Sequence, residues 1–328
     1  MISGHIKMKN EIIEIGNEVV DLQIKALKKL KNSINQSFNE AVKAIIKCKS
    51  KVIICGVGKS GKIASKISST LSSVGSPSFS ISANDCSHGD LGRISRQDLL
   101  ILISYSGNTN ELKDLIKYAK NNKISLIGIV SNKDSNLYKS ANIKLYIPEV
   151  MESGLGIVPT SSTTAQLCLG DALAIAAMKE KKFGKLDFKK FHPAGNLGKK
   201  LKTASDVMLV KSKIPFVNQN EIMKKALKIL NSKKLGFLVL INDEGLNTGV
   251  FTDGDLKRIM QKKKIIDNLK IKQFMTKKPF IIEKNTLATE ILNLMNKKKI
   301  TNVCVYDKKN KKKTVGVIHI HNLINALK

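Results

Sequence analysis

The chain has 328 residues, which is enough for two domains that each bury a core of their own. Lys and Arg number 57 against 26 Asp and Glu, so the formal net charge is +31. Almost all basic residues are lysines spread along the chain, because arginine occurs only at positions 93, 96 and 258. Nucleic-acid-binding surfaces more often cluster arginine with aromatic residues, and tryptophan is absent, so the composition argues against a nucleic-acid partner.

The cysteines form neither C-x-x-C pairs nor the regular spacing of a disulfide framework, which is typical of a reducing compartment. The chain opens with no secretory hydrophobic region, and no apolar run approaches the ~18–20 residues of a membrane span. We therefore expect a soluble cytoplasmic protein with no membrane partner. The cysteines are Cys48, Cys55, Cys86, Cys168 and Cys304.

Residues 8 to 48 carry apolar residues at three-to-four spacing, which predicts one or two long amphipathic helices. A DNA-binding helix-turn-helix would need three short helices and tight turns in the same space. We expect residues 1–48 to form an N-terminal helical segment that packs on the next domain or on a second subunit.

Residues 49–203 form the next predicted domain, in which short apolar runs alternate with amphipathic stretches. This alternation predicts an α/β fold with a doubly wound parallel sheet. Ligands of such sheets gather at the carboxyl ends of the strands. Strands are expected near 52–55, 78–82, 99–103, 125–130 and 143–147, and helices near 62–74, 110–121 and 134–140.

Two turns after predicted strands carry the strongest indications of a site. The first, GVGKSG at 56–61, fits G-x-G-x-x-G, so a dinucleotide site is the rival interpretation. However, Asp85 lies several positions too late to be the acidic residue that holds a ribose, and no Walker motif occurs. The second turn, SYSGNT at 104–109, places three hydroxyls where a phosphomonoester would bind. The sequence therefore favours a phosphate site.

Polar segments after the sheet extend the candidate site. Glu152 lies in ESGLG at 152–156, and His192 lies in the turn-rich FHPAG segment at 191–195. A long apolar helix is predicted from Thr163 to Lys181, with Ser161 or Ser162 as its N-cap. The polar opening of this helix could contact an anion or sugar hydroxyls.

The pattern changes from about Ser205. Two related segments, GVFTDGDL at 249–256 and GVIHIHNL at 316–323, begin 67 residues apart, and DVM at 206 and QFM at 273 repeat this offset. An internal repeat of this length indicates one structural unit used twice. We expect the two copies to cover residues 204–268 and 269–328.

The S-x-S-G-x-T turn after a buried strand resembles the sugar isomerase (SIS) family, whose members bind phosphosugars. Four further motifs narrow the resemblance to the D-arabinose-5-phosphate isomerases, over nearly the whole chain. The resemblance implies a flavodoxin-like SIS domain, interconversion of D-ribulose 5-phosphate and D-arabinose 5-phosphate for Kdo and lipopolysaccharide biosynthesis, and a homotetramer. The motifs are Gly58-Lys59-Ser60-Gly61, Ser87-His88-Gly89-Asp90-Leu91-Gly92, Pro159-Thr160-Ser161-Ser162-Thr163-Thr164 and His192-Pro193-x-Gly195-x-Leu197-Gly198.

Such an isomerisation needs a base that moves a proton between adjacent carbons through an enediol, and an acid or cation that steadies the oxyanion. No cofactor is required. The resemblance implies catalytic roles for Lys59, Glu111, Glu152 and His192, with Glu152 as the best candidate for the base. Glu111 could equally serve only to stabilise the first turn of its helix. His192 could open the sugar ring or act as an acid, in its own site or in that of a neighbouring subunit.

The remaining residues implied by the resemblance bind substrate. Lys59 could also hold the phosphate or polarise the carbonyl group. His88 and Cys86 suggest a metal, yet two ligands do not make a zinc site, so only adventitious, inhibitory zinc at His88 is expected. The predicted substrate-binding residues are Gly58, Ser60, His88, Ser104, Ser106, Thr109, Ser161 and Thr163.

The C-terminal repeat resembles a pair of CBS modules, which often bind adenosine-bearing ligands. The resemblance implies a regulatory nucleotide or nucleotide-sugar site at Thr252 and Asp255 in the first copy. The second copy carries Ile320 and Asn322 instead, so at most one such site is expected. A purely structural or oligomerising role for the pair stays open.

Two further function classes remain as alternatives to an enzyme. A non-catalytic phosphosugar sensor with SIS and CBS domains would need no carboxylates at the sugar carbons and would usually carry a DNA-binding domain. The predicted carboxylates and the absence of a helix-turn-helix pattern favour the enzyme. A scaffold regulated by the CBS pair would bind no sugar phosphate at all.

Overall fold

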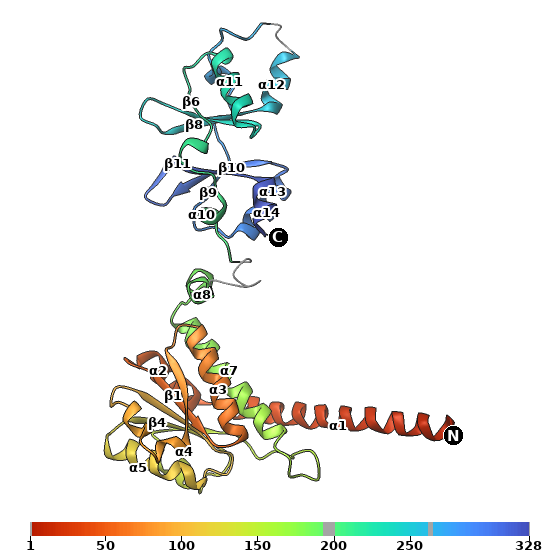
Figure 1. Ribbon diagram of the computed structural model, residues 1–328, viewed down its shortest axis with the longest axis vertical. Helices are drawn as coiled ribbons and strands as arrows, with labels where there is room; N and C mark the ends of the chain where they lie inside the picture. The colour runs from red at the N-terminus through yellow and green to blue at the C-terminus, as the bar shows by residue number, and fades with distance from the viewer. Residues whose placement is uncertain (1, 193–200, 262–264, 328) are drawn as a thin grey trace. The chain divides into compact units, whose positions relative to one another are not determined.

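The computed structural model describes residues 2–192, 201–261 and 265–327, with the backbone alone for residues 2–10. The chain divides into two compact units, Met1–Phe188 and Lys189–Lys328, which are described one at a time (Figure 1). In the described residues, no helix is both long enough and apolar enough to cross a membrane.

The first unit is built on a five-stranded, fully parallel sheet in the order β2-β1-β3-β4-β5. This topology confirms the predicted doubly wound α/β fold. β1 and β3 are buried along their whole length, because the apolar runs VIIC and LLILI face helices on both sides of the sheet. The strands are β1 (Val52–Gly56), β2 (Ser78–Ser82), β3 (Leu99–Ile103), β4 (Ser125–Val130) and β5 (Ile143–Tyr146).

Helices cover both faces of this sheet. On one face, α2 (Gln36–Lys47), α3 (Lys59–Ser73) and α7 (Ser161–Glu180) share a core with the end of α1 (Ile2–Ser33). On the other face, α5 (Lys113–Asn121) packs beside three short segments. These segments are α4 (Ala83–Cys86), α6 (Asn136–Ser140) and the 3-10 turn η1 (Asp90–Arg93).

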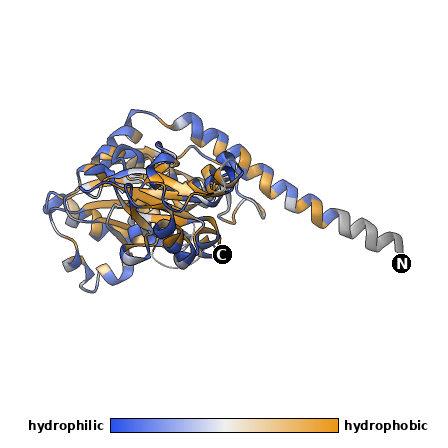
Figure 2. Ribbon diagram, turned by 90° about the horizontal axis from the view of Figure 1, so that it is seen from above, coloured by the Kyte–Doolittle hydropathy of each residue, from blue (hydrophilic) through white to orange (hydrophobic). Residues whose placement is uncertain are grey.

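Among its described side chains, the N-terminal helix is packed near its C-terminal end. Ala26 and Leu30 are buried against the first unit, whereas residues 11–18 are exposed. Figure 2 shows hydrophobic residues alternating with hydrophilic ones along the projecting part of α1. Two long helices, α1 and α2, therefore occupy the predicted N-terminal helical segment, as expected.

The helix α7 was predicted to begin at Thr163, with Ser161 or Ser162 as its N-cap, and both predictions were wrong. The helix begins at Ser161, and the N-cap position falls to Thr160, whose side chain makes no capping hydrogen bond. The Glu152 carboxylate supplies the acceptor instead, from eight residues earlier in the chain.

The second unit contains two three-stranded sheets of related topology, β6-β7-β8 and β11-β10-β9, which pack together through Phe237, Val239, Cys304 and Val317. The first sheet comprises β6 (Phe216–Asn218), β7 (Phe237–Ile241) and β8 (Asn247–Thr252), with α11 (Met223–Lys233) and α12 (Asp253–Met260). The second comprises β9 (Ile281–Glu283), β10 (Asn302–Asp307) and β11 (Asn310–His319), with α13 (Ala288–Lys298) and α14 (Ile320–Leu327). The short helices α8 (Lys185–Phe191) and α10 (Ala204–Val207) precede them.

The two repeats exchange their opening segments. Ala204, which opens the first repeat, packs in the core of the second, whereas Phe274 and Met275 pack on the core of the first. Neither repeat therefore completes its core without the other.

The sheet register corrects the alignment of the two repeats. Thr252 and His319 each end the last strand of their sheet, and each directly precedes a helix. His319, not Ile320, therefore occupies the position equivalent to Thr252, since a shift of one residue would turn the side chain to the other face. Asn322 corresponds to Asp255, as predicted.

Candidate active site

The predicted phosphate turn follows β3 and is held by its own hydroxyls. The oxygens Ser104 Oγ and Thr109 Oγ1 lie 2.7 Å apart, and the Gly107 N–H donates to Ser104 Oγ at 2.9 Å. Ser104 is buried, whereas Thr109 is half-buried and Ser106 is exposed. The Ser104 hydroxyl therefore shapes the turn, while Ser106 and Thr109 are the members that an incoming phosphate can reach.

Gly107 is required where the turn passes α6. Its φ of +70° lies in the left-handed region, and an added Cβ would come within 2.1 Å of Ser135 Oγ. The adjacent Asn108 Oδ1 accepts the Asn136 N–H at 2.9 Å. These contacts fix the turn on the neighbouring helix.

The glycine turn after β1 lies at the same sheet edge. β1 and β3 pair in parallel with Gly56 opposite Ile103, so both turns leave the sheet on its carboxyl side. Gly58 has a φ of +58° and precedes Lys59, which is exposed and opens α3. A cavity of about 430 Å³ lies between the start of α3 and the end of β2 and includes Gly58 in its lining.

Glu152 lies at the N-terminus of α7, in a position to accept several hydrogen bonds. Its Oε2 accepts the backbone N–H groups of Thr160 and Ser161, each at 2.8 Å, and that of Ser162 at 3.3 Å. The Thr160 hydroxyl donates to the same oxygen at 3.2 Å. All four of these hydrogen bonds go to Oε2, so this oxygen fixes the carboxylate at the start of α7.

The helix terminus also controls the charge of Glu152. Burial by itself raises the pKa of the carboxyl group, but the Ser162 hydroxyl and the three backbone N–H groups outweigh burial and lower the pKa below its usual value. Glu152 is therefore ionised at neutral pH, as a proton acceptor must be.

Glu111 and His88 lie at the same edge and are both exposed. Glu111 is in the 3-10 turn η2 (Asn110–Leu112), directly after the phosphate turn and before α5. His88 follows α4, and the neighbouring Ser87 hydroxyl donates to Asp114 at 3.2 Å, which ties this loop to α5. The structure thus brings Lys59, Glu111 and His88 to the sheet edge where ligands are expected.

The predicted substrate contacts at the start of α7 are less accessible than expected. Ser161 is fully buried, and among the described residues its hydroxyl has no hydrogen-bond partner. The Thr163 hydroxyl donates to the carbonyl oxygens of Thr160 and Pro159, at 2.9 and 3.3 Å. Their proposed contacts with substrate stay predictions.

His192 is half-buried and directly follows α8, in the second unit. The rest of its motif, residues 193–198, lies outside the described residues. The role of His192 stays a prediction.

No group of three or more His, Cys, Asp or Glu residues that could hold a metal ion occurs in the described part of the chain. Cys86 is buried, and burial together with Asp90 and Asp85 raises the pKa of its thiol to about 11. This thiol is therefore protonated at neutral pH, which makes it a poor partner for His88 in binding zinc.

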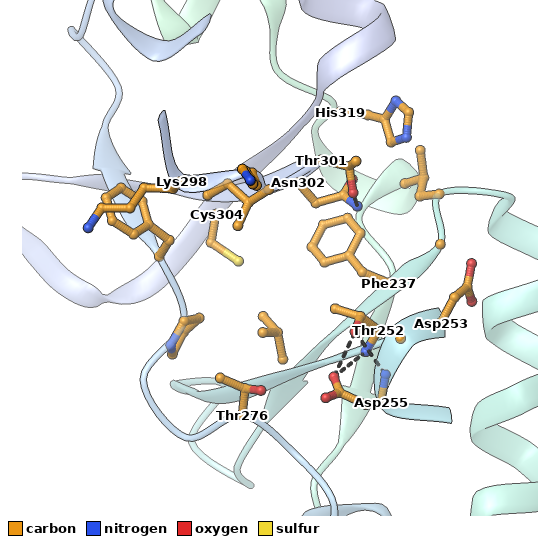
Figure 3. A pocket seen from close by; sticks show the side chains of 18 of the residues that line it. Phe237, Thr252, Asp253, Asp255, Thr276, Lys298, Thr301, Asn302, Cys304 and His319 are labelled. Atoms are coloured by element: carbon orange, nitrogen blue, oxygen red, sulfur yellow. Dashed lines mark hydrogen bonds between the residues drawn. The ribbon is translucent and has the colours of Figure 1, made fainter. Parts of the chain in front are cut away.

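The second unit contains a cavity of about 820 Å³ that is lined by both repeats (Figure 3). Thr252 and Asp255 lie on its wall, where Asp255 Oδ2 accepts hydrogen bonds from the Thr252 N–H at 2.9 Å and from its hydroxyl at 2.8 Å. Arg258 pairs with the other oxygen of Asp255. Basic side chains outnumber the two acidic ones in this lining: Lys234, Arg258, Lys278, Lys298 and Lys299 against Asp253 and Asp255.

His319 takes the place of Thr252 in the second repeat and also lines the cavity (Figure 3). Its Nδ1 accepts the His321 N–H at 3.3 Å, and the two rings are 5.1 Å apart. Burial and, to a smaller extent, the neighbouring His321 lower the pKa of His319. The side chain is therefore mainly neutral at pH 7.

Comparison with known proteins identifies an SIS domain in the first unit and two CBS domains in the second. The SIS domain model matches residues 45–176, and the CBS domain model matches residues 204–262 and 271–328. The arabinose 5-phosphate isomerase KdsD of Yersinia pestis is 40% identical over 315 residues, covering 95% of both chains. The chain belongs to the arabinose 5-phosphate isomerase family.

Other members and a solved structure extend this comparison. KdsD of Escherichia coli K12 is 38% identical, again over 95% of both chains. The structure of c3406 from E. coli CFT073 in complex with arabinose 5-phosphate has a TM-score of 0.54 and 35% identity. It covers 56% of this chain, whereas 98% of that chain is matched, so the neighbour corresponds to one part of this family member.

Two residues that contribute to the site were missed from the sequence. Ser60 Oγ donates to Gln166 Oε1 at 3.1 Å, which links the start of α3 to α7. Gln166 is almost fully buried, and a polar residue among the apolar residues of the helix was the available signal. Tyr105 was not recognised because it lies among the serines and the threonine of the phosphate turn. Its hydroxyl accepts the N–H of Val150, which lies 45 residues later in the chain.

The geometry of the phosphate turn predicts different effects for the hydroxyls at its two ends. Thr109→Val should raise KM for a sugar phosphate about 10- to 100-fold, since a charge-assisted hydrogen bond contributes ~1.5–3 kcal/mol. Ser104→Ala should in addition lower the free energy of unfolding by ~1–3 kcal/mol, because the Gly107 N–H loses its acceptor. Steady-state kinetics and denaturant unfolding measure the two effects. Thr70→Val, which removes a hydroxyl within α3, is the matched control.

The effect on KM should be absent for the phosphate-free sugar. Equal losses with the sugar and its phosphate would contradict a phosphate role for Thr109.

Glu152→Gln should lower kcat by ~10²–10⁴ and leave substrate binding nearly unchanged. The glutamine carbonyl can replace Oε2 at the helix terminus, whereas its amide group cannot accept a proton in place of Oε1. Asp98→Asn is the control, because Asp98 likewise accepts backbone N–H groups and has a lowered pKa, but it precedes β3 at the opposite sheet edge. Near-normal turnover by the Glu152 variant would show that this residue is not the base.

Proposed function

We propose that this family member interconverts D-ribulose 5-phosphate and D-arabinose 5-phosphate as an aldose–ketose isomerase. The near full-length relatives of that name and the structural neighbour bound to arabinose 5-phosphate support this substrate pair. The observation that carries the proposal is a carboxylate fixed through one oxygen, in a segment that Tyr105 joins to a turn that can bind phosphate.

Each group in the proposed mechanism has one task. Ser106 and Thr109 hold the phosphate, which places the sugar carbonyl group near Glu152. Glu152 removes a proton from C1 of ribulose 5-phosphate, and the electron pair forms the C1–C2 double bond of an enediol while the C2 oxygen takes up a proton. Glu152 then returns a proton to C2, and the C1 hydroxyl loses its proton as the aldehyde forms.

The remaining predicted groups assist this reaction. Lys59 steadies the developing oxyanion or the phosphate, and His192 opens the ring form of the aldose as an acid. Glu111 either assists proton transfer or stabilises the helix that follows it. These steps need no cofactor, and zinc at His88 would inhibit the enzyme.

We further propose that the enzyme acts as a homotetramer. Its α1 is apolar on two sides: Val19, Leu22 and Ala26 face the first unit, whereas Ile13, Val20 and Ile24 are exposed. A helix that is apolar on more than one side is normally covered on each. A second copy of the chain would cover the exposed side, and it could contribute His192 to the neighbouring site.

The proposed cellular role follows from the product. Arabinose 5-phosphate would supply Kdo and lipopolysaccharide biosynthesis, and the enzyme would work in the cytoplasm, where its five cysteines stay reduced.

The second unit is proposed to bind a regulatory ligand. The surplus of basic side chains in its cavity suits a phosphate-bearing ligand, and Thr252 with Asp255 suits a ribose. A nucleotide or a nucleotide sugar has both features. His319 and Asn322 replace this pair in the second repeat, so one site per chain is proposed.

A coupled assay of purified protein with D-ribulose 5-phosphate tests the activity directly. Formation of arabinose 5-phosphate at kcat values of about 1–10³ s⁻¹ is expected for an enzyme on its own substrate. Tight binding of the sugar phosphate without conversion would favour a phosphosugar sensor, and the absence of binding would favour a scaffold.

A chain that ends after Lys202 should keep its isomerase activity but lose any response to nucleotides. Its first unit carries the proposed site except for His192, which the shortened chain retains, and 98% of the neighbour c3406 matches 56% of this chain. Turnover should be measured for both chains with and without a panel of nucleotides and nucleotide sugars. A folded but inactive shortened chain would show that the CBS pair is needed to build the site.

Ile13→Asp combined with Ile24→Asp should split the tetramer into smaller species, because two charges would be buried in the proposed interface. Light scattering coupled to size-exclusion chromatography measures the mass in solution. Lys25→Asp, on a neighbouring exposed position of α1, is the control. An unchanged mass for the double variant would contradict the proposed role of α1.

A further inference from the structure

Tyr105 lies between the two serines of the phosphate turn, and it connects this turn to the segment that carries Glu152. The Val150 N–H donates to Tyr105 Oη at 2.9 Å across 45 residues of sequence. Val150 precedes Glu152 by two residues. A single phenol oxygen therefore joins the proposed phosphate site to the proposed base.

The backbone of Tyr105 is fixed by the sheet. The Ser104 N–H donates to the Ile129 carbonyl oxygen at 3.1 Å, and the Ser131 N–H donates to the Tyr105 carbonyl oxygen at 2.9 Å. The Tyr105 ring is partly buried against the core that α3 and α7 share with the sheet. Its hydroxyl therefore has little freedom to move unless the turn moves with it.

The segment before Glu152 is held at few points. The Lys29 side chain donates to the Glu149 carbonyl oxygen at 3.0 Å, from an exposed position. The Val150 N–H is partly buried, and Tyr105 Oη supplies its acceptor. Without this bond, the segment would depend on the exposed Lys29 contact with Glu149 and on the contacts of Glu152 and Ser153 with the start of α7.

We propose that Tyr105 is a positioning residue that transmits phosphate binding at the serine turn to the Glu152 carboxylate. The inference rests on the proposed isomerase function. Binding of a remote, non-reacting group accelerates a reaction only when its energy is used to orient the reacting groups. Tyr105 provides the physical connection for this use, since it belongs to the phosphate turn and bonds to the segment that carries the base.

The test separates phosphate binding from the sugar on which the base acts. D-Ribulose, which lacks the phosphate, is the substrate, and inorganic phosphite is added as a separate dianion. With the unaltered protein, phosphite should raise kcat/KM for ribulose by ~10-fold or more. In Tyr105→Phe this activation should fall below about 2-fold, and kcat for ribulose 5-phosphate should fall ~5- to 20-fold with KM nearly unchanged.

Tyr118→Phe is the matched control, because the Tyr118 hydroxyl also bonds to one backbone group, the Ile94 carbonyl oxygen at 3.4 Å, between α5 and η1. Both variants should show similar small changes in melting temperature, but only Tyr105→Phe should lose the activation. Retained activation in Tyr105→Phe, equal loss in both variants, or no activation of the unaltered protein would each overturn the inference. Failure of the unaltered protein to convert ribulose 5-phosphate would overturn the proposed function as well.

Discussion

The structure of the first unit depends on which group accepts hydrogen bonds from the backbone N–H groups at the start of α7. A helix of 20 residues leaves its first N–H groups without intrahelical partners, and here three backbone N–H groups at its start donate to one oxygen of Glu152. The same contact fixes a carboxylate at the sheet edge and lowers its pKa. The contact between Glu152 and α7 thus supplies an acceptor for the helix N-terminus and also keeps the proposed base ionised.

The other parts of the site are positioned by the parallel sheet. Because β1 and β3 are neighbours, the glycine turn and the serine turn emerge side by side, and Ser60 connects the first of them to α7 through Gln166. The sequence predicted this sheet, since its strands are continuous apolar runs bounded by turn residues. It could not predict the contacts of Glu152 or Tyr105, because each joins residues that only the folded chain brings together. The N-cap of α7 was placed wrongly for this reason, since local capping rules consider only adjacent side chains.

The C-terminal repeat shows a different limit of sequence reasoning. The 67-residue offset identified the two copies and itself makes His319 equivalent to Thr252, so naming Ile320 at this position was wrong by one residue, as the strand register confirms. The exchange of opening segments between the copies was not predicted, because Ala204 and Met275 read as ordinary members of their own repeats. Through this exchange each repeat contributes to the core of the other, and both line the same cavity.

In the proposed mechanism, a carboxylate moves a proton between C1 and C2 of the sugar phosphate through an enediol. Isomerisation of ribulose 5-phosphate in D₂O tests it, with NMR detection of deuterium in the product. Glu152 is only partly buried, so its proton should exchange with solvent during the enediol lifetime. We expect deuterium at C2 of arabinose 5-phosphate. Product formed with complete retention of hydrogen at C2 would contradict proton transfer by a solvent-accessible carboxylate and would favour a direct hydride shift.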